Sequence, residues 1–133
     1  MYLRPHVGLK VKSLEKSIDF YRYIFQAEVD LFNESMRFAT MVIKTFEFNL
    51  FEKKGTASLL APKAFHLGIR VDSKNEVDAV YERGETMGAK ILAEPYERFD
   101  GDYTFFLKDP DGLPLEVFYG DHEQMRQESQ SLQ

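Results

Sequence analysis

Two histidines and one glutamate of this chain have the residue types of a metal-binding set. His6 opens the segment HVGLKVKSLEKSIDFY, and His66 opens the related segment HLGIRVDSKNEVDAVY sixty residues later. Glu116 comes shortly after an Asp-Pro-Asp-Gly sequence. Two imidazoles and a carboxylate can hold a catalytic divalent metal and leave coordination positions open for a substrate. The sequence therefore predicts a metal centre formed by His6, His66 and Glu116.

The two segments indicate an internal repeat, because they match at six offsets without a gap. The matching positions hold His, Gly, a basic residue, Val, Ser and Tyr. A histidine in a strand also has a simpler interpretation as an ordinary polar residue, and this interpretation stays open for His6 and His66. His122, the third histidine, lies in a polar tail and is expected to be a surface residue. Equivalence within the repeat favours the metal interpretation for the first two.

Alternating residues around each histidine predict a strand with one face on a core. Branched aliphatic residues occupy one face of the segments at 6–11 and 65–71, and the histidines occupy the other. Ser13 and Ser73 are expected to cap the helices that follow. Further elements are predicted as helices at 14–26 and 74–87 and as strands at 27–33, 37–43, 46–51, 90–94, 103–108 and 113–119. Each half is therefore expected to be a βαβββ module.

The predicted fold class is α+β, as one domain at residues 1–133 with helices on the outer face. The modules cover about 4–52 and 64–120, a mixture of Lys, Gly, Ser and Pro links them at 53–63, and the tail at 121–133 is polar. An isolated module would leave the open face of its sheet in water. Two modules, of one chain or of two chains, must therefore combine.

Composition limits the classes of function. A hydrophobic content of 44%, with 14% aromatic residues, is typical of a folded domain. The net charge of −5 and the scattered Lys and Arg residues argue against nucleic acid as a partner. No apolar run could cross a membrane and no secretory signal opens the chain, so a cytoplasmic protein is expected. The absence of cysteine leaves histidine, carboxylate and amide oxygen as metal ligands.

Strand parity adds candidate substrate-binding residues. Glu116 reaches the same cavity as the histidines if the aliphatic residues of the last strand pack under a helix. Aromatic residues of the last two strands are expected to line a pocket, although such residues are more often plain core. Basic residues with the parity of the histidines are expected either to bind an anionic substrate or to extend their charged heads into water. These candidates are Tyr103, Phe105, Phe118, Lys10 and Arg70.

The order of these residues resembles the vicinal oxygen chelate superfamily, which includes glyoxalase I, methylmalonyl-CoA epimerase, extradiol dioxygenases, fosfomycin-resistance enzymes and bleomycin-binding proteins. The resemblance covers about residues 4–120, and its most specific pieces are SLEKSIDFYRYIF at 13–25 and FFLKDPDGLPLEVF at 105–118. It implies a curved mixed sheet with a metal in a central cleft, and commonly a homodimer. The implied cofactor is one divalent ion (Fe, Mn, Zn, Ni and Co are not distinguished) that chelates two neighbouring substrate oxygens and stabilises an enolate or oxyanion.

Departures from the family patterns narrow the reaction. Some members have a fourth metal ligand, a glutamate in the strand that closes the first module, and Asn49 is at the matching position here. An amide cannot accept a proton, which argues against a glyoxalase or epimerase and leaves Asn49 as a substrate-binding candidate. Ring-cleaving dioxygenases resemble a pattern with another active-site histidine, and this chain offers no third inward histidine. The segment at 99–103 is similar to a loop of fosfomycin-resistance enzymes, but Gly8 replaces a hydroxyl donor of that group and the nearby cation Arg98 is not at a matching position.

The preferred hypothesis is a divalent-metal-dependent enzyme of the glyoxalase, fosfomycin-resistance and dioxygenase type. It is expected to act on a small oxygen-chelating substrate by lyase, isomerase or transferase chemistry rather than by ring cleavage. The alternative is a non-catalytic protein of the bleomycin-resistance type that binds a small molecule, such as a drug, in the same cleft. A fold retained for dimerisation or regulation is a third hypothesis.

Overall fold

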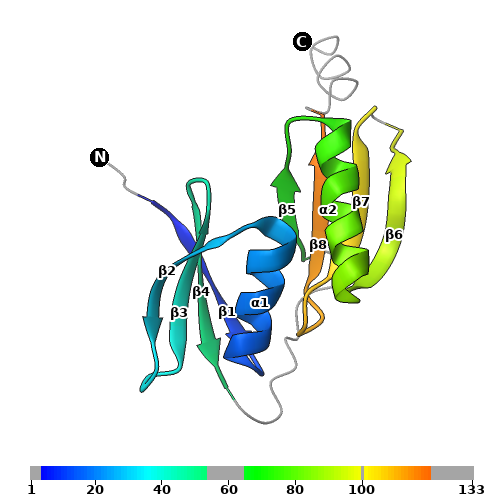
Figure 1. Cartoon of the computed structure of the whole chain (residues 1–133). Helices are drawn as coiled ribbons and strands as arrows, with labels where there is room; N and C mark the ends of the chain where they lie inside the picture. Colours follow the sequence, from blue (N-terminus) through cyan, green and yellow to red (C-terminus); the bar gives the residue numbers. More distant parts are fainter. Residues whose placement is uncertain (1–3, 54–64, 100, 121–133) are drawn as a thin grey trace. The chain divides into compact units, whose positions relative to one another are not determined.

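The structure, a computed structural model, describes residues 4–53, 65–99 and 101–120. The chain divides into two compact units (Figure 1). The first unit holds the N-terminal half together with residues 109–112, and the second unit holds the remainder. Neither helix of the described residues is long and apolar enough to span a bilayer. Most of the predicted linker and the whole predicted tail, which contains His122, lie outside the described residues.

The first unit is a βαβββ module with a mixed four-stranded sheet. Strand β4 lies between β1 and β3, pairs in parallel with β1 and pairs antiparallel with β3, so that the sheet order is β1-β4-β3-β2. Helix α1 packs against strands β2, β3 and β4. The elements are β1 (His6–Val11), α1 (Leu14–Phe25), β2 (Glu28–Asn33), β3 (Phe38–Ile43) and β4 (Phe46–Glu52).

Local sequence explains where α1 begins and ends. The Ser13 side chain accepts a hydrogen bond from the backbone N–H of Lys16 at 3.3 Å, which satisfies one donor of the first turn. Gln26 adopts a left-handed conformation with φ of 56°, which ends the helix. The predicted stripe of apolar residues is buried, and with its neighbours it comprises Leu14, Ser17, Ile18, Phe20, Tyr21, Ile24 and Phe25. Hydrophobic periodicity therefore fixes the face of α1 that meets the sheet.

The second unit repeats the order and pairing of the first. Its sheet order is β5-β8-β7-β6, with β5 parallel to β8 and the other pairs antiparallel. Ser73 caps α2 by accepting from the N–H of Glu76 at 3.0 Å, and Gly88 ends the helix with φ of 77°. The elements are β5 (Leu67–Arg70), α2 (Lys74–Met87), β6 (Lys90–Glu97), β7 (Tyr103–Lys108) and β8 (Pro114–Tyr119). The predicted α+β fold of two βαβββ modules is confirmed.

Strand β6 is longer than predicted. It continues to Glu97, beyond the predicted end at residue 94. Its pairing with β7 shifts between Ile91 and Ala93 and again between Ala93 and Tyr96. Such bulges keep a strand paired across an interruption. The extension places the segment after β6 beside the start of β7, where it contributes to the site.

The strand registers identify one pair of equivalent residues in the two modules. Gly8 of β1 pairs with Asn49 of β4, and Gly68 of β5 pairs with Glu116 of β8. Because Gly8 and Gly68 are repeat equivalents, Asn49 and Glu116 occupy the same position in their modules. The fold thus has an amide in one module where the other has a carboxylate.

The Asp-Pro-Asp-Gly turn is part of the first unit, although it joins β7 to β8. The buried hydroxyl of Tyr21 donates a hydrogen bond to Asp109 Oδ2 at 2.8 Å. The backbone N–H of Lys12 donates to Asp111 Oδ1 at 2.9 Å. Burial, together with the neighbouring Asp109 carboxylate, raises the pKa of Tyr21 well above its usual range. This sequence motif therefore supplies a buried acceptor to α1, through Asp109, and a second acceptor to the backbone just before the helix, through Asp111.

Candidate functional site

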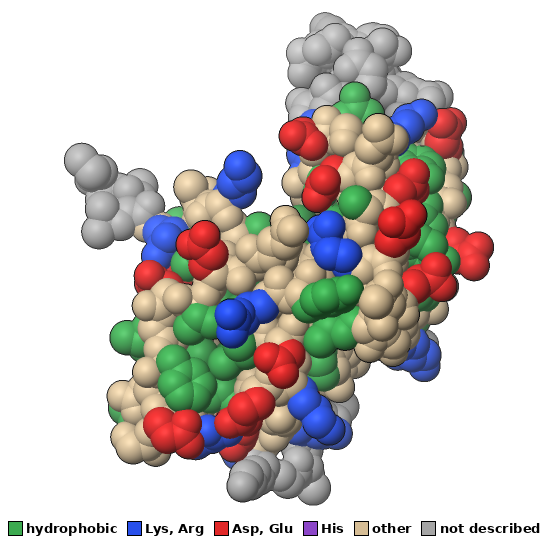
Figure 2. All heavy atoms as spheres, viewed as in Figure 1, with side chains coloured by type: hydrophobic (Ala, Val, Ile, Leu, Met, Phe, Trp, Pro, Cys, Tyr) green, Lys and Arg blue, Asp and Glu red, His purple; other side chains and the backbone are tan. Residues whose placement is uncertain are grey.

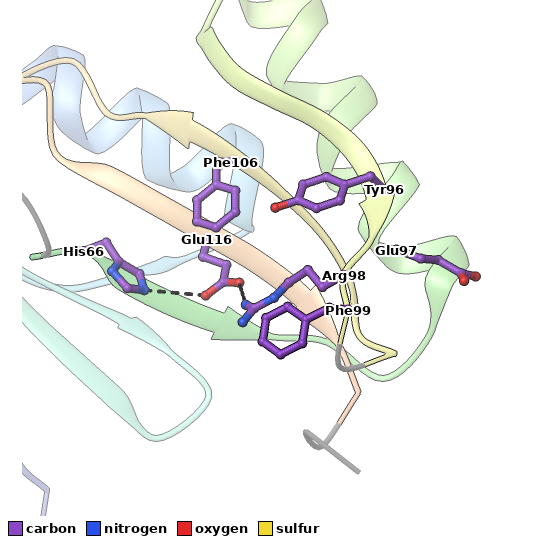
Figure 3. A pocket seen from close by; sticks show the side chains of 7 residues that line it. All are labelled: His66, Tyr96, Glu97, Arg98, Phe99, Phe106 and Glu116. Atoms are coloured by element: carbon purple, nitrogen blue, oxygen red, sulfur yellow. Dashed lines mark hydrogen bonds and ion pairs between the residues drawn. The ribbon is translucent and has the colours of Figure 1, made fainter. Parts of the chain in front are cut away.

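A pocket with a volume of about 560 Å³ lies on one face of the second sheet (Figure 3). His66 directly precedes β5, and Glu116 lies in the adjacent strand β8. Arg98 follows β6, so the pocket gathers side chains from three separate segments of the module. Its lining residues are His66, Tyr96, Glu97, Arg98, Phe99, Phe106 and Glu116.

Glu116 is an acidic residue in a buried position, with 7% of its surface exposed. Arg98 Nη1 lies 2.6 Å from Glu116 Oε2, and the hydroxyl of Thr104 donates to the same oxygen at 3.1 Å. A buried carboxylate is costly unless it is paired and hydrogen-bonded. The guanidinium and the hydroxyl therefore offset the cost of burying Glu116.

The second carboxylate oxygen of Glu116 faces His66. Nε2 of His66 lies 3.5 Å from Oε1 of Glu116, as Figure 3 shows. Two donors that are each about 2.1 Å from one metal ion are roughly 3 to 3.5 Å apart. The separation and the chemistry of an imidazole with a carboxylate therefore fit two ligands of a divalent ion.

Aromatic side chains form the other walls of the pocket. Phe106 is paired with Glu116 across the β7–β8 ladder, and its ring centroid lies 6.4 Å from that of His66. Phe99 is 76% exposed, and Tyr96 is also exposed. Exposed large apolar groups beside a pocket with a few polar groups are typical of small-molecule sites.

The charges of the pocket are nearly balanced in the described residues. The Arg98 guanidinium is opposite the Glu116 carboxylate. The Glu97 carboxylate points away from the pocket in Figure 3 and lies 2.8 Å from Lys74 Nζ. The hydrogen bond from Lys74 lowers the pKa of Glu97. A bound divalent cation would therefore give this pocket a net positive charge.

Tyr103 and Phe105 lie under α2 rather than in the pocket. The Tyr103 hydroxyl donates to Asp78 Oδ1 at 2.7 Å, which raises the pKa of Tyr103. Phe105 is fully buried, and its ring centroid is 5.4 Å from that of Tyr81 in α2. Both residues therefore belong to the helix-facing side of β7. Residues of the opposite parity in that strand, among them Phe106, face the pocket side.

Phe118 and Arg70 lie on the same face of the sheet as Glu116, as their parity predicted, but outside the pocket lining. Phe118 is half-buried and pairs with Arg70 across β5 and β8. Arg70 is exposed and lines a second hollow of about 380 Å³, together with residues that include Asp72 and Tyr119. A role of either residue at the His66–Glu116 pocket stays a prediction.

In the first unit, the predicted site residues lie on the sheet face opposite α1. His6 and Lys10 are exposed on β1. Asn49 is half-buried, and its Oδ1 accepts a hydrogen bond from the Thr40 hydroxyl at 2.9 Å. Over residues 4–53, 65–99 and 101–120, neither unit by itself brings three or more His, Asp or Glu side chains within reach of one metal ion. His66 and Glu116 thus form part of a candidate metal site, and His6 as a further ligand stays a prediction.

Charged side chains do not gather by sign on the faces drawn in Figure 2. Lys and Arg are mixed with Asp and Glu on the visible face of each unit. The chain as a whole carries a net charge of −5. The visible face of neither unit thus presents a large patch of a single sign.

A repeated βαβββ module with a histidine and a buried carboxylate facing an aromatic-walled pocket defines a small α+β protein of the paired-module class. The chain belongs to the Glyoxalase/Bleomycin resistance protein/Dioxygenase superfamily, whose family model matches residues 4–117. A relative from Bacillus subtilis (strain 168), named probable trivalent organoarsenical cleaving enzyme, is 32% identical over 136 aligned positions, covering 95% of this chain and 87% of the relative.

Solved structures share the fold at lower identity. A fosfomycin resistance protein of Listeria monocytogenes, complexed with Mn(II) and sulfate, superposes with a TM-score of 0.78 at 22% identity, covering 93% of this chain and 95% of that chain. Lactoylglutathione lyase of Agrobacterium tumefaciens superposes with a TM-score of 0.67 at 21% identity, covering 87% of this chain and 92% of that chain. These two likenesses establish the fold. The Bacillus subtilis relative is the one of these three proteins that is similar enough to indicate more than the fold, and it is named as an enzyme.

Proposed function

We propose that this protein is a divalent-metal-dependent enzyme that acts on a small oxygen-chelating substrate. His66 and Glu116 would hold the metal, together with His6 of the same chain or of a second copy. The observation that carries the proposal is the 3.5 Å separation of His66 Nε2 and Glu116 Oε1 in an aromatic-walled pocket. We favour lyase, isomerase or group-transfer chemistry over ring cleavage, because the described pocket lining contains no histidine besides His66 that could be the additional active-site residue of ring-cleaving enzymes.

The bound ion would act as a Lewis acid on two neighbouring substrate oxygens. The protein groups contribute binding and orientation. Phe106 and the exposed rings of Tyr96 and Phe99 give the pocket apolar walls that can hold a hydrocarbon part of the substrate and exclude water. Because Arg98 balances Glu116, the positive charge of the ion favours a substrate that chelates as an anion.

The name of the Bacillus subtilis relative suggests a trivalent organoarsenical as an alternative substrate class. Trivalent arsenic is a soft centre, and soft centres prefer thiolate ligands. This chain has no cysteine. We therefore favour an oxygen-chelating substrate over an arsenical held by thiolates of the protein.

A non-catalytic binding protein is the second candidate, and the exposed aromatic rings at the pocket favour it. Phe99 and Tyr96 could hold an aromatic ligand by stacking, without a metal. The two candidates differ in their dependence on metal. Ligand binding that is unchanged by a chelator would support the binding protein.

The metal proposal is tested by calorimetric titration of the chelator-treated protein with Mn(II), Fe(II), Co(II), Ni(II) and Zn(II). Saturable binding of at least one ion is expected, and Glu116→Gln and His66→Gln should weaken it at least about 10-fold because each removes a ligand. His6→Gln should have the same effect. The control Glu82→Gln, at an exposed carboxylate of α2 that is not part of the pocket lining, should bind as the wild type does. His122→Gln is the matched histidine control.

Two results would contradict the proposal. One is the absence of saturable binding for all five ions. The other is equal affinity in the wild type and the Glu116→Gln variant. Binding that is lost in the Glu116 and His66 variants but not in His6→Gln would retain the pocket and remove His6 from the ligand set.

A further inference from the structure

We propose that Arg98, assisted by Thr104, is a positioning residue that fixes one oxygen of Glu116 and leaves the other for the metal. The inference rests on the proposed function, because it concerns how Glu116 is presented as a ligand. It adds that the carboxylate would bind through Oε1 alone. Neither the family match nor the sequence assigns a role to Arg98.

The backbone holds Arg98 in place. It lies just after β6, where its N–H donates to the carbonyl of Asp102 at 2.7 Å and its own carbonyl accepts from Gly101 at 3.0 Å. These bonds close the connection between β6 and β7. Figure 3 shows the Arg98 side chain extending from this connection to the Glu116 carboxylate. The guanidinium therefore starts from an anchored backbone position.

Arg98 and the Thr104 hydroxyl both lie within hydrogen-bond distance of one oxygen of Glu116, and the single proton of the hydroxyl is shared between this oxygen and the carbonyl of Val117. Arg98 Nη1 lies 2.6 Å from Oε2, a distance typical of a strong charge-assisted contact. The fully buried Thr104 hydroxyl lies 3.1 Å from the same atom and 3.0 Å from the carbonyl of Val117. Oε1 instead faces His66 Nε2. The carboxylate is thus oriented before any ligand arrives.

This orientation has a consequence for coordination. Hydrogen-bonded outer groups fix the geometry of a ligand and determine which of its atoms meets the metal. If Glu116 contributed Oε1 only and each of two histidines one nitrogen, the protein would supply three donor atoms and leave the remaining coordination positions to the substrate. Two neighbouring substrate oxygens need two of the open positions. A carboxylate that bound through both oxygens would remove one of them.

An opposing effect of Arg98 must be separated from this one. A guanidinium near a metal ligand also repels a cation, and this repulsion would weaken metal binding. The two effects predict opposite results when Arg98 is removed. Loss of positioning lowers metal affinity, whereas loss of repulsion raises it.

The experiment titrates metal-free protein with Mn(II) alone and measures the dissociation constant by calorimetry. Arg98→Met removes the donor and the charge, and we expect affinity to fall about 10- to 100-fold. Arg98→Gln is neutral but keeps a donor, and it should recover a part of the loss. Thr104→Val removes the second donor at nearly constant volume and should give a smaller loss. Thermal unfolding of each metal-free variant verifies that it is folded.

Lys74→Met is the matched control. It removes a basic side chain of the same module whose contact with Glu97 is 2.8 Å long but lies away from the pocket. Its Mn(II) affinity should equal that of the wild type. A merely structural role of Arg98 would lower the unfolding temperature of Arg98→Met without changing the Mn(II) affinity of the folded protein.

Each outcome bears on the proposal. Arg98→Met that binds Mn(II) as tightly as the wild type, or more tightly, overturns the positioning role and leaves the metal proposal intact. Recovery by Arg98→Gln supports positioning by a hydrogen bond, and its failure to exceed Arg98→Met contradicts it. If Arg98→Met does not fold, Arg98→Gln and Thr104→Val decide the question. A wild type that binds no Mn(II) or other divalent ion overturns both proposals together.

Discussion

Tyr21 illustrates how a single buried hydroxyl connects distant parts of the sequence. Its ring is 1% exposed, and its hydroxyl donates to Asp109, eighty-eight residues away in sequence. A buried carboxylate that loses a donor has a large desolvation cost to meet. The local energetics of the first unit therefore depend on this bond.

Tyr21→Phe tests that dependence. The variant keeps the ring and removes the donor, so we expect the free energy of unfolding to fall by about 1–3 kcal/mol. Tyr23→Phe is the control, because Tyr23 lies on the same helix and is 45% exposed. Urea denaturation measures both. Equal stability of the two variants would show that the Asp109 contact contributes little.

Asn49 and Glu116 show how one residue changes the chemistry of equivalent positions. Each accepts a hydrogen bond from a threonine of the neighbouring strand, Thr40 at 2.9 Å and Thr104 at 3.1 Å. The carboxylate additionally has Arg98, which lies in the connection after β6. The charged Glu116 thus has a guanidinium as a partner in addition to a threonine hydroxyl. The second module is thus the one equipped to present an anionic ligand.

At the scale of elements, the cap of α2 is a local determinant of the second module. Ser73→Ala should lower the free energy of unfolding by about 1 kcal/mol, because the Glu76 N–H loses its acceptor. Ser73→Asp keeps an acceptor and adds a favourable charge at the helix start, so it should retain most of the stability. Thermal and urea denaturation of the two variants provide the measurement. A Ser73→Asp variant as unstable as Ser73→Ala would argue against capping as the cause.

Element prediction from the sequence succeeds where periodicity is strong. The stripe of α1, the caps Ser13 and Ser73 and the alternation of β1 and β8 were all predictable, because each depends on residues close together in the chain. The end of β6 was not, because bulges continue the strand past a segment that contains Pro95. An element can therefore be predicted from the sequence where the local pattern is regular, and its end cannot be predicted where bulges interrupt that pattern.

The register of the β7–β8 hairpin explains why Phe106 lines the pocket and Tyr103 and Phe105 do not. Parity within β7 grouped Tyr103 with Phe105, but parity alone does not tell which side of the strand meets the helix. The turn at 109–112 pairs Lys108 with Pro114, and stepping outward from this pair places Phe106 opposite Glu116. The sequence contained this information in the length of the turn. The contact of Arg98 with Glu116 could not be predicted in this way. Arg98 lies after the end of β6, where strand parity no longer determines the direction of a side chain.

At the scale of the whole molecule, tyrosine ionisation should govern stability at alkaline pH. The pKa of Tyr21 is raised well above its usual range, that of Tyr81 is raised to about 12, mainly by burial, and that of Tyr103 is raised by its bond to Asp78. Tyrosines of the unfolded chain ionise near about pH 10. Above that pH the unfolded state loses protons that the folded state keeps, so the free energy of unfolding falls as pH rises.

Urea denaturation between about pH 8 and pH 11 measures this slope. We expect stability to be nearly level at the lower end and to fall beyond about pH 10. Tyr21→Phe should make the fall shallower, because one of the contributing protons is removed. A rise in stability over the same range, or an unchanged slope in the variant, would contradict the assignment.

The equivalence of Asn49 and Glu116 has a consequence for how such a chain can diverge. An architecture made by duplication begins with two equivalent modules. A substitution at one equivalent position, such as that of Asn49 and Glu116, is enough to give the two modules different chemistry. The residue at position 49 can then change without altering the module that holds Glu116. Ligand preference in a duplicated protein of this kind can therefore change at the neutral position while the carboxylate of the other module keeps its partners.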